Sequence, residues 1–175
     1  MYEKLKQQIL AENSRRNVDL IAGTIGDDPD LFSCLIRMML TEQEPYNVKA
    51  AWVITAVTDS YPWLLDSHLD KIIPFLKKKQ PDGIIRCMVR QLSKITLPEK
   101  HMGVVFDLCF SWAENPKYAL AIRANAMSVV YEISNTHKDL KPELIVLFEQ
   151  IGEEEAPAMI SRSRLLLKKL NKEIR

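Results

Sequence analysis

A pattern of apolar, basic and small residues returns along this chain at a spacing of 37 residues. Residues 122–126 read Ile-Arg-Ala-Asn-Ala, and 37 positions earlier residues 85–89 read Ile-Arg-Cys-Met-Val. Another 37 positions earlier, residues 48–52 read Val-Lys-Ala-Ala-Trp. Similarity at a fixed period of roughly 20–50 residues is typical of a solenoid, in which small supersecondary units stack on one another. The repeat therefore constrains the fold more than any other feature does.

Prolines and capping residues indicate where helices begin. Proline suits the first helical position, because its missing N–H would have no partner within the helix. In Asp28-Pro29 and Asn115-Pro116 a capping residue comes directly before the proline. Ser67 and Asp70 resemble a capping box. Pro74 lies inside a predicted helix and is expected to kink it. About ten helices are predicted, over residues 2–12, 14–25, 29–40, 45–59, 67–78, 82–95, 98–113, 116–135, 142–153 and 157–172.

The first helices of successive pairs also repeat. Sixteen apolar or small residues fall into four aligned rows, namely 32, 35, 36 and 39; 69, 72, 73 and 76; 106, 109, 110 and 113; and 144, 147, 148 and 151. Four helix pairs follow from these rows, and residues 1–27 form a degenerate fifth pair. Terminal units of a solenoid are usually atypical, because one of their faces meets water.

These segments resemble HEAT repeats, with Armadillo-type repeats as a near alternative, from about residue 29 to 170. The resemblance implies an all-α, right-handed α-α superhelix of four to five pairs in one domain, with units at 1–27, 28–65, 66–96, 97–137 and 138–175. In that family a basic residue of the second helix pairs with an Asp in the preceding turn. The basic position is occupied here by Lys49, Arg86, Arg123 and Arg164. Asp82 precedes Arg86, but the nearest candidates elsewhere are Asn115 and Gln43, so an incomplete ladder is expected.

Composition narrows the classes of function. The 24 Lys and Arg nearly balance the 23 Asp and Glu, which argues against a dedicated nucleic-acid binder. No apolar run is long enough for a membrane span, and residues 1–7 contain no apolar signal core. The three cysteines form no CxxC or Cys/His cluster, so neither disulfides nor zinc are indicated. A cytoplasmic protein without cofactor or metal is expected.

The sequence contains no catalytic motif, and no enzyme activity is predicted. The histidines at 68, 101 and 137 are expected to be surface or capping residues. Cys87 and Cys109 fall on apolar rows and are expected in the core, whereas Cys34 is expected to be partly exposed. Trp52 is predicted to pack in the core. For Tyr61 and Trp63 two interpretations stay open, packing over a junction between units or docking of a partner.

The predicted function is a non-enzymatic interaction or scaffold module, a monomer or weak oligomer that binds a protein or peptide. In such stacks the second helices usually line the concave face. The predicted contact residues are the side chains of those helices that lie off the core rows, namely Lys49, Arg86, Arg90, Asn125, Glu132 and Arg164.

Two alternatives remain. HEAT-like DNA-alkylation-repair glycosylases hold DNA in a basic groove with Trp, Arg and a carboxylate, and the possible counterparts here are Arg86, Arg90, Arg123 and Trp52 or Trp63. Arginines clustered without acidic neighbours would favour nucleic-acid binding, and arginines interspersed with acids would disfavour it. The third hypothesis is that the chain belongs to a larger assembly and stacks on another solenoid. Apolar side chains exposed at either end would favour that hypothesis.

Overall fold

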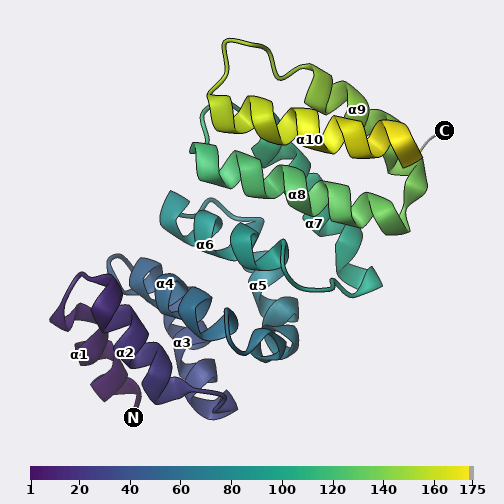
Figure 1. The fold of residues 1–175 in the computed structure, drawn as a ribbon. Coiled ribbons are helices and arrows are strands. Elements are labelled where there is room, and N and C mark those ends of the chain that lie inside the picture. Colours follow the sequence, from purple (N-terminus) through teal and green to yellow (C-terminus); the bar gives the residue numbers. More distant parts are fainter. Residues whose placement is uncertain (174–175) are drawn as a thin grey trace. The chain divides into compact units, whose positions relative to one another are not determined.

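A computed structural model describes residues 1–173 of the chain, and this part is all-helical (Figure 1). Over these residues no helix has the length and apolarity needed to cross a bilayer. The ten α-helices and two 3₁₀ helices are α1 (Tyr2–Ala11), α2 (Arg15–Ile25), α3 (Pro29–Thr41), α4 (Tyr46–Thr58), η1 (Pro62–His68), α5 (Leu69–Leu76), α6 (Asp82–Leu92), α7 (Glu99–Glu114), α8 (Leu120–Thr136), η2 (Lys138–Leu140), α9 (Lys141–Glu149) and α10 (Pro157–Glu173). The helices form two compact units, Met1–Ile95 and Thr96–Arg175.

Helix α4 is the centre of the first unit. It contacts α1, α2, α3, α6 and η1, and residues on all of its sides are therefore buried. Two of these residues are threonines whose hydroxyls are satisfied within the helix, since Thr55 Oγ1 donates to Ala51 O at 2.9 Å and Thr58 Oγ1 to Ile54 O at 2.8 Å. A helix surrounded in this way needs apolar residues around its whole circumference rather than along one stripe.

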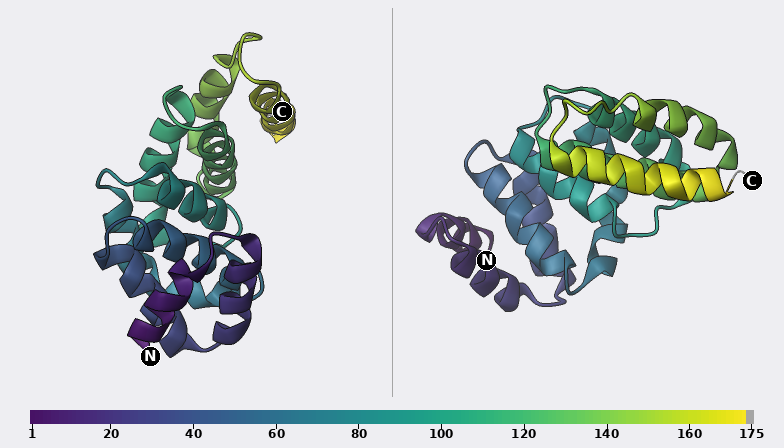
Figure 2. Two further views of the ribbon diagram at one scale, coloured as in Figure 1. Left: turned by 90° about the vertical axis from the view of Figure 1, so that its left-hand side faces the viewer. Right: turned by 45° about the horizontal axis from the view of Figure 1, so that its top comes forward.

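Helix α8 has the same role in the second unit. It contains residues 122–126 of the sequence repeat and packs against α7, α9, α10 and η2. Ile122 and Ala126 of the repeat segment are completely buried. Helices α8 and α10 lie side by side in the ribbon views (Figures 1 and 2). The repeated segment thus marks the helix on which the other helices of this unit pack.

The four predicted rows lie in the core. Fourteen of the sixteen positions are buried, and the other two, Phe110 and Ile151, are partly buried. Large apolar side chains are exposed near both ends of the chain, namely Met1, Leu10, Leu20, Val146 and Leu165, and also at Trp63 and Leu120. This exposure is the feature that the larger-assembly hypothesis expects.

Two predicted helix starts are wrong. The fifth helix begins at Leu69 rather than at Ser67, because residues 62–68 already form η1 and the N-cap, His68, makes no side-chain capping bond. The eighth helix begins at Leu120 rather than at Pro116, because Asn115 closes a turn there: its Oδ1 accepts from Lys117 N at 3.0 Å. The helix predicted over 142–153 is shorter and spans Lys141–Glu149.

Other local predictions are confirmed. The Asp28 carboxylate caps α3 by accepting from the backbone N–H groups of Asp30 and Leu31 at 2.8 and 3.1 Å, and Pro29 is at the first helical position. Pro74 lies inside α5, which ends two residues later at Leu76. Its expected kink stays a prediction.

Candidate partner-binding surfaces

All six predicted contact residues lie on second helices, but in two different units. Lys49 lies on α4, and Arg86 and Arg90 lie on α6, in the first unit. Asn125 and Glu132 lie on α8, and Arg164 on α10, in the second unit. The surrounding contacts of each residue show which of them are available to a partner.

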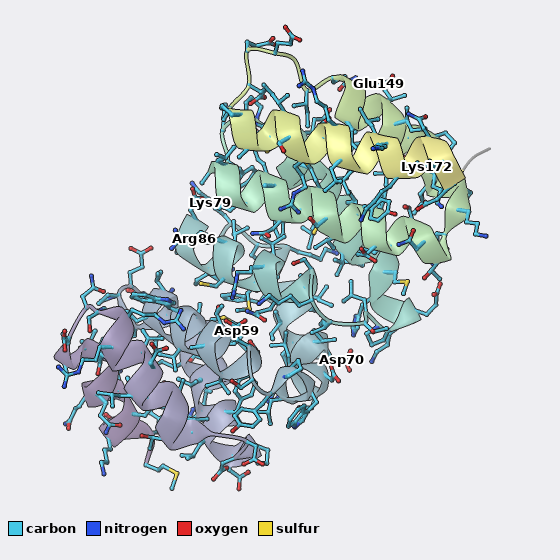
Figure 3. All side chains as sticks on the ribbon, in the orientation of Figure 1. Asp59, Asp70, Lys79, Arg86, Glu149 and Lys172 are labelled. Atoms are coloured by element: carbon cyan, nitrogen blue, oxygen red, sulfur yellow. The ribbon has the colours of Figure 1, made fainter. Side chains whose placement is uncertain are left out.

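Arg90 is held by an internal ion-pair cluster centred on Asp59, which lies where α4 faces α6 (Figure 3). The Arg90 guanidinium donates to both Asp59 carboxylate oxygens at 3.1 Å, and Lys94 Nζ donates to Oδ1 at 2.6 Å. Burial raises the pKa of Asp59, but hydrogen bonds from Lys94, Arg90 and Gln91 outweigh it and hold that pKa below its usual range. Arg90 therefore joins α6 to α4.

Arg123, at the basic position of the repeat, is buried rather than exposed. Its Nε donates to Ala113 O at 3.1 Å, and Nη1 and Nη2 donate to the two Glu155 oxygens at 2.9 and 2.8 Å. The hydrogen bonds from Arg123 hold the pKa of Glu155 below its usual range. The partner thus comes from the following repeat, and the nearest candidate in the sequence, Asn115, instead closes the turn before α8.

Three of the remaining contact residues also have internal partners. Lys49 Nζ donates to Asn13 Oδ1 at 3.0 Å, and Asn125 Nδ2 donates to the backbone at 2.8 Å. Glu132 is exposed and accepts from the Asn135 amide at 3.2 Å.

Arg164 and Arg86 are exposed, as Glu132 is. An Nη atom of Arg164 lies 3.6 Å from a Glu153 oxygen, but both side chains are largely exposed and such pairs contribute little stability. Arg86 is exposed in the first turns of α6 (Figure 3). The exposed members of the predicted contact set are therefore Arg86, Glu132 and Arg164.

Several side-chain contacts join residues that are roughly one repeat apart in the sequence. Tyr2 donates to Glu42 across 40 positions, Lys141 donates to Glu173 across 32, and Tyr131 donates to Glu173 across 42. The Arg90–Asp59 and Arg123–Glu155 pairs span 31 and 32 positions. All of these contacts except Lys141–Glu173, which lies within the last helix pair, join adjacent repeats. Sequence reasoning missed the acidic partners because they do not lie at one fixed offset from the basic residue.

The expectation of surface or capping histidines is wrong for His101, whereas His68 is buried but stands at the N-cap of α5. His68 and His101 are buried, whereas His137 is half-buried and its Nε2 lies 2.8 Å from a Glu99 oxygen. His68 Nε2 lies 3.4 Å from Ser33 Oγ, and its Nδ1 has no hydrogen-bond partner. Burial, together with the charge of Lys71, lowers the pKa of His68, which favours the neutral ring.

The cysteines lie where the repeat predicted. Cys87 and Cys109 are buried, and burial raises the pKa of both thiols. Cys34 is partly exposed. In the part of the chain that the structure describes, no three His, Cys, Asp or Glu side chains are grouped so that they could hold a metal ion.

The aromatic residues divide between core and surface. Trp112 is buried, whereas Trp52, predicted to be in the core, is only partly buried. Trp63 on η1 has 57% of its surface exposed and meets the ring of Tyr61 edge-on, with the centroids 5.5 Å apart. Both interpretations of this pair stay predictions, although the exposure of Trp63 fits docking better than packing.

Comparison with known proteins agrees with this architecture. The HEAT repeat domain family matches residues 2–170 of the chain. Searches of curated proteins and of solved structures found no match. The period of 37, the all-helical structure and a match over almost the whole length agree, and the chain belongs to the HEAT-repeat family.

Proposed function

We propose that this chain is a non-enzymatic binding module that holds a protein or peptide through exposed side chains of its second helices. HEAT repeats commonly act as protein-interaction scaffolds. The proposed contact set is the one that the sequence predicted, of which Arg86, Glu132 and Arg164 are exposed. Lys49, Arg90 and Asn125 contribute only if they exchange their internal hydrogen bonds for bonds to the partner.

The observation that carries the proposal is the contrast between Arg86 and Arg123. They occupy the same repeat position, 37 residues apart. Arg123 is buried against Glu155, whereas Arg86 is exposed. An exposed guanidinium on a helix can bind a partner's carboxylate in a bidentate way, and arginine is enriched at protein interfaces. Arg86 is therefore the best anchor for a partner that presents Asp or Glu.

Apart from the exposed Arg86, the arginines do not support the nucleic-acid alternative. Arg90 and Arg123 pair with carboxylates, Arg164 lies near one, and Arg162 donates to the hydroxyl of Ser128. Guanidinium groups that are already paired have less to offer to phosphates. This interspersed pattern is the one expected of a protein that does not bind nucleic acid through these arginines.

The proposal is tested by affinity capture from lysate of the native host, with and without nuclease, and then by titration of the purified partner. Arg86→Glu is expected to raise Kd by about tenfold or more, because it places like charges against the partner's carboxylate. Lys71→Glu is the matched control, since it makes the same charge change on an exposed residue of α5, a first helix. A change of less than about twofold is expected there.

Two results would contradict the proposal. One is recovery that disappears with nuclease, which would favour nucleic-acid binding. The other is an equal loss of affinity in Arg86→Glu and Lys71→Glu, which would mean that long-range charge, rather than the second-helix surface, determines binding.

A further inference from the structure

The second unit contains an open groove between α7, the end of α8 and η2, which is separate from the six contact residues discussed above. It encloses about 330 Å³. Apolar side chains from all three elements form its floor, namely Met102, Phe106, Ile133 and Leu140. We call this site the α7–α8 groove. A floor of this kind offers burial to an apolar side chain of a ligand.

Gly103 is one of the residues that line the groove. It is exposed on α7, and no atom lies within 4 Å of the position that a Cβ would occupy. A larger side chain at this lining position would meet no packed neighbour at its Cβ. Occupation of the groove can thus be blocked from Gly103 without disturbing a packed neighbour.

The rim of the α7–α8 groove is acidic. Glu99, Asp107 and Asp139 line it. The one basic group among its described lining residues is His137, whose Nε2 lies 2.8 Å from a Glu99 oxygen. Asp107 and Asp139 are exposed, and Lys100 and Lys138, the nearest lysines in sequence, are not among the lining residues. An apolar floor below several carboxylates is complementary to a segment with both apolar and cationic side chains.

We propose that the α7–α8 groove binds a segment of a partner protein in which Arg or Lys stands beside a large apolar side chain. The apolar side chain enters the groove over Gly103, and the cation meets Asp107 or Asp139 at the rim. This proposal does not rest on the exposed side chains of the second helices. Those side chains include Arg86 and Arg164 and favour an acidic segment of a partner, whereas the α7–α8 groove favours a basic one. The two surfaces would contact different segments.

The test begins with a phage-displayed library of random 12-residue peptides selected on the complete chain. Enriched sequences are expected to combine Arg or Lys with a neighbouring Leu, Phe or Trp. One enriched peptide is then synthesised with a fluorescent label, and its Kd is measured by anisotropy. Gly103→Trp is expected to weaken binding by about tenfold or more by filling the groove. Asp107→Lys and Asp139→Lys are expected to weaken it through charge repulsion.

Gly23→Trp is the matched control. Gly23 is also exposed inside a helix, α2, and no atom lies within 4 Å of the place that its Cβ would take. Its variant is expected to change Kd by less than about twofold, and circular dichroism checks that both tryptophan variants keep their helix content. If Gly103→Trp loses structure, the two charge reversals at exposed rim residues still decide the question.

Three results would overturn the proposal. The first is enrichment of peptides without basic residues, or no enrichment at all. The second is equal affinity in Gly103→Trp and Gly23→Trp together with no effect of the charge reversals. The third is concentration-dependent self-association that Gly103→Trp abolishes, which would make a second copy of this chain the occupant. The exposed Leu165, beside Arg164 and Lys168 on α10, has suitable chemistry for that role.

Discussion

Arg123→Ala is expected to lower the free energy of unfolding by about 2–4 kcal/mol, because a buried, hydrogen-bonded charge is removed from the centre of the second unit. Only 7% of the Arg123 side chain is exposed, and it satisfies both Glu155 and the Ala113 carbonyl. Its loss leaves that carbonyl without its donor and removes the link between α8 and the loop before α10. The equivalent change Arg86→Ala, at an exposed position, is expected to alter stability by less than about 0.5 kcal/mol.

Urea denaturation of the wild type and both variants, followed by circular dichroism, measures this difference. Acid titration adds a second test. The pKa of Glu155 is lowered in the folded state, so the stability that it contributes is present above the unfolded pKa of about 4.3 and is lost as the pH falls through the folded value. Arg123→Ala should lack this part of the pH dependence. Equal stabilities of the Arg123→Ala and Arg86→Ala variants would contradict the role assigned to Arg123.

Phe148→Ala is expected to lower the free energy of unfolding by about 3–5 kcal/mol, because it opens a cavity in the core. Phe148 on α9 is completely buried, and its carbonyl accepts from Ser163 Oγ of α10 at 2.6 Å. Phe110 holds the equivalent row position on α7, but it is only partly buried, with its ring centroid 5.8 Å from that of Phe106. Phe110→Ala should therefore cost less, about 1–2 kcal/mol.

The same denaturation series compares the two phenylalanine variants. Because the substitution is identical and both residues lie on first helices, the difference between them reports burial. A larger loss for Phe110→Ala than for Phe148→Ala would mean that the core of the second unit is arranged differently.

The sequence predicted the helices whose apolar pattern is long and regular. Residues 122–126 mark a buried helix because Ile122 and Ala126 lie one turn apart on the same face, and the structure places both in the core. Residues 62–68 show no such pattern, because a 3₁₀ helix has a period of about three residues and this one is only seven residues long. Pro116 was misleading because proline suits both turns and first helical positions.

The partners of the basic residues could not be predicted. Asp59 lies at the end of a helix and Glu155 lies in a loop, so neither is at a repeating offset from Arg90 or Arg123. Their positions follow from how adjacent repeats stack. One feature of the α7–α8 groove can be recognised in the sequence. Gly103 and Asp107 are four residues apart, which places them on the same face of a helix. The apolar residues that α8 and η2 contribute to that groove become visible only in the folded unit.

Native-state hydrogen exchange, read by mass spectrometry, most directly tests the claim that α4 and α8 are the helices on which the two units are built. Amides that open only with the whole unit exchange slowest, whereas those at frayed ends exchange early. We predict the slowest exchange in Tyr46–Thr58 and Leu120–Thr136, with faster exchange in the terminal helices α1 and α10. Slowest exchange in α1 or α10, or equal rates in all helices, would contradict the claim.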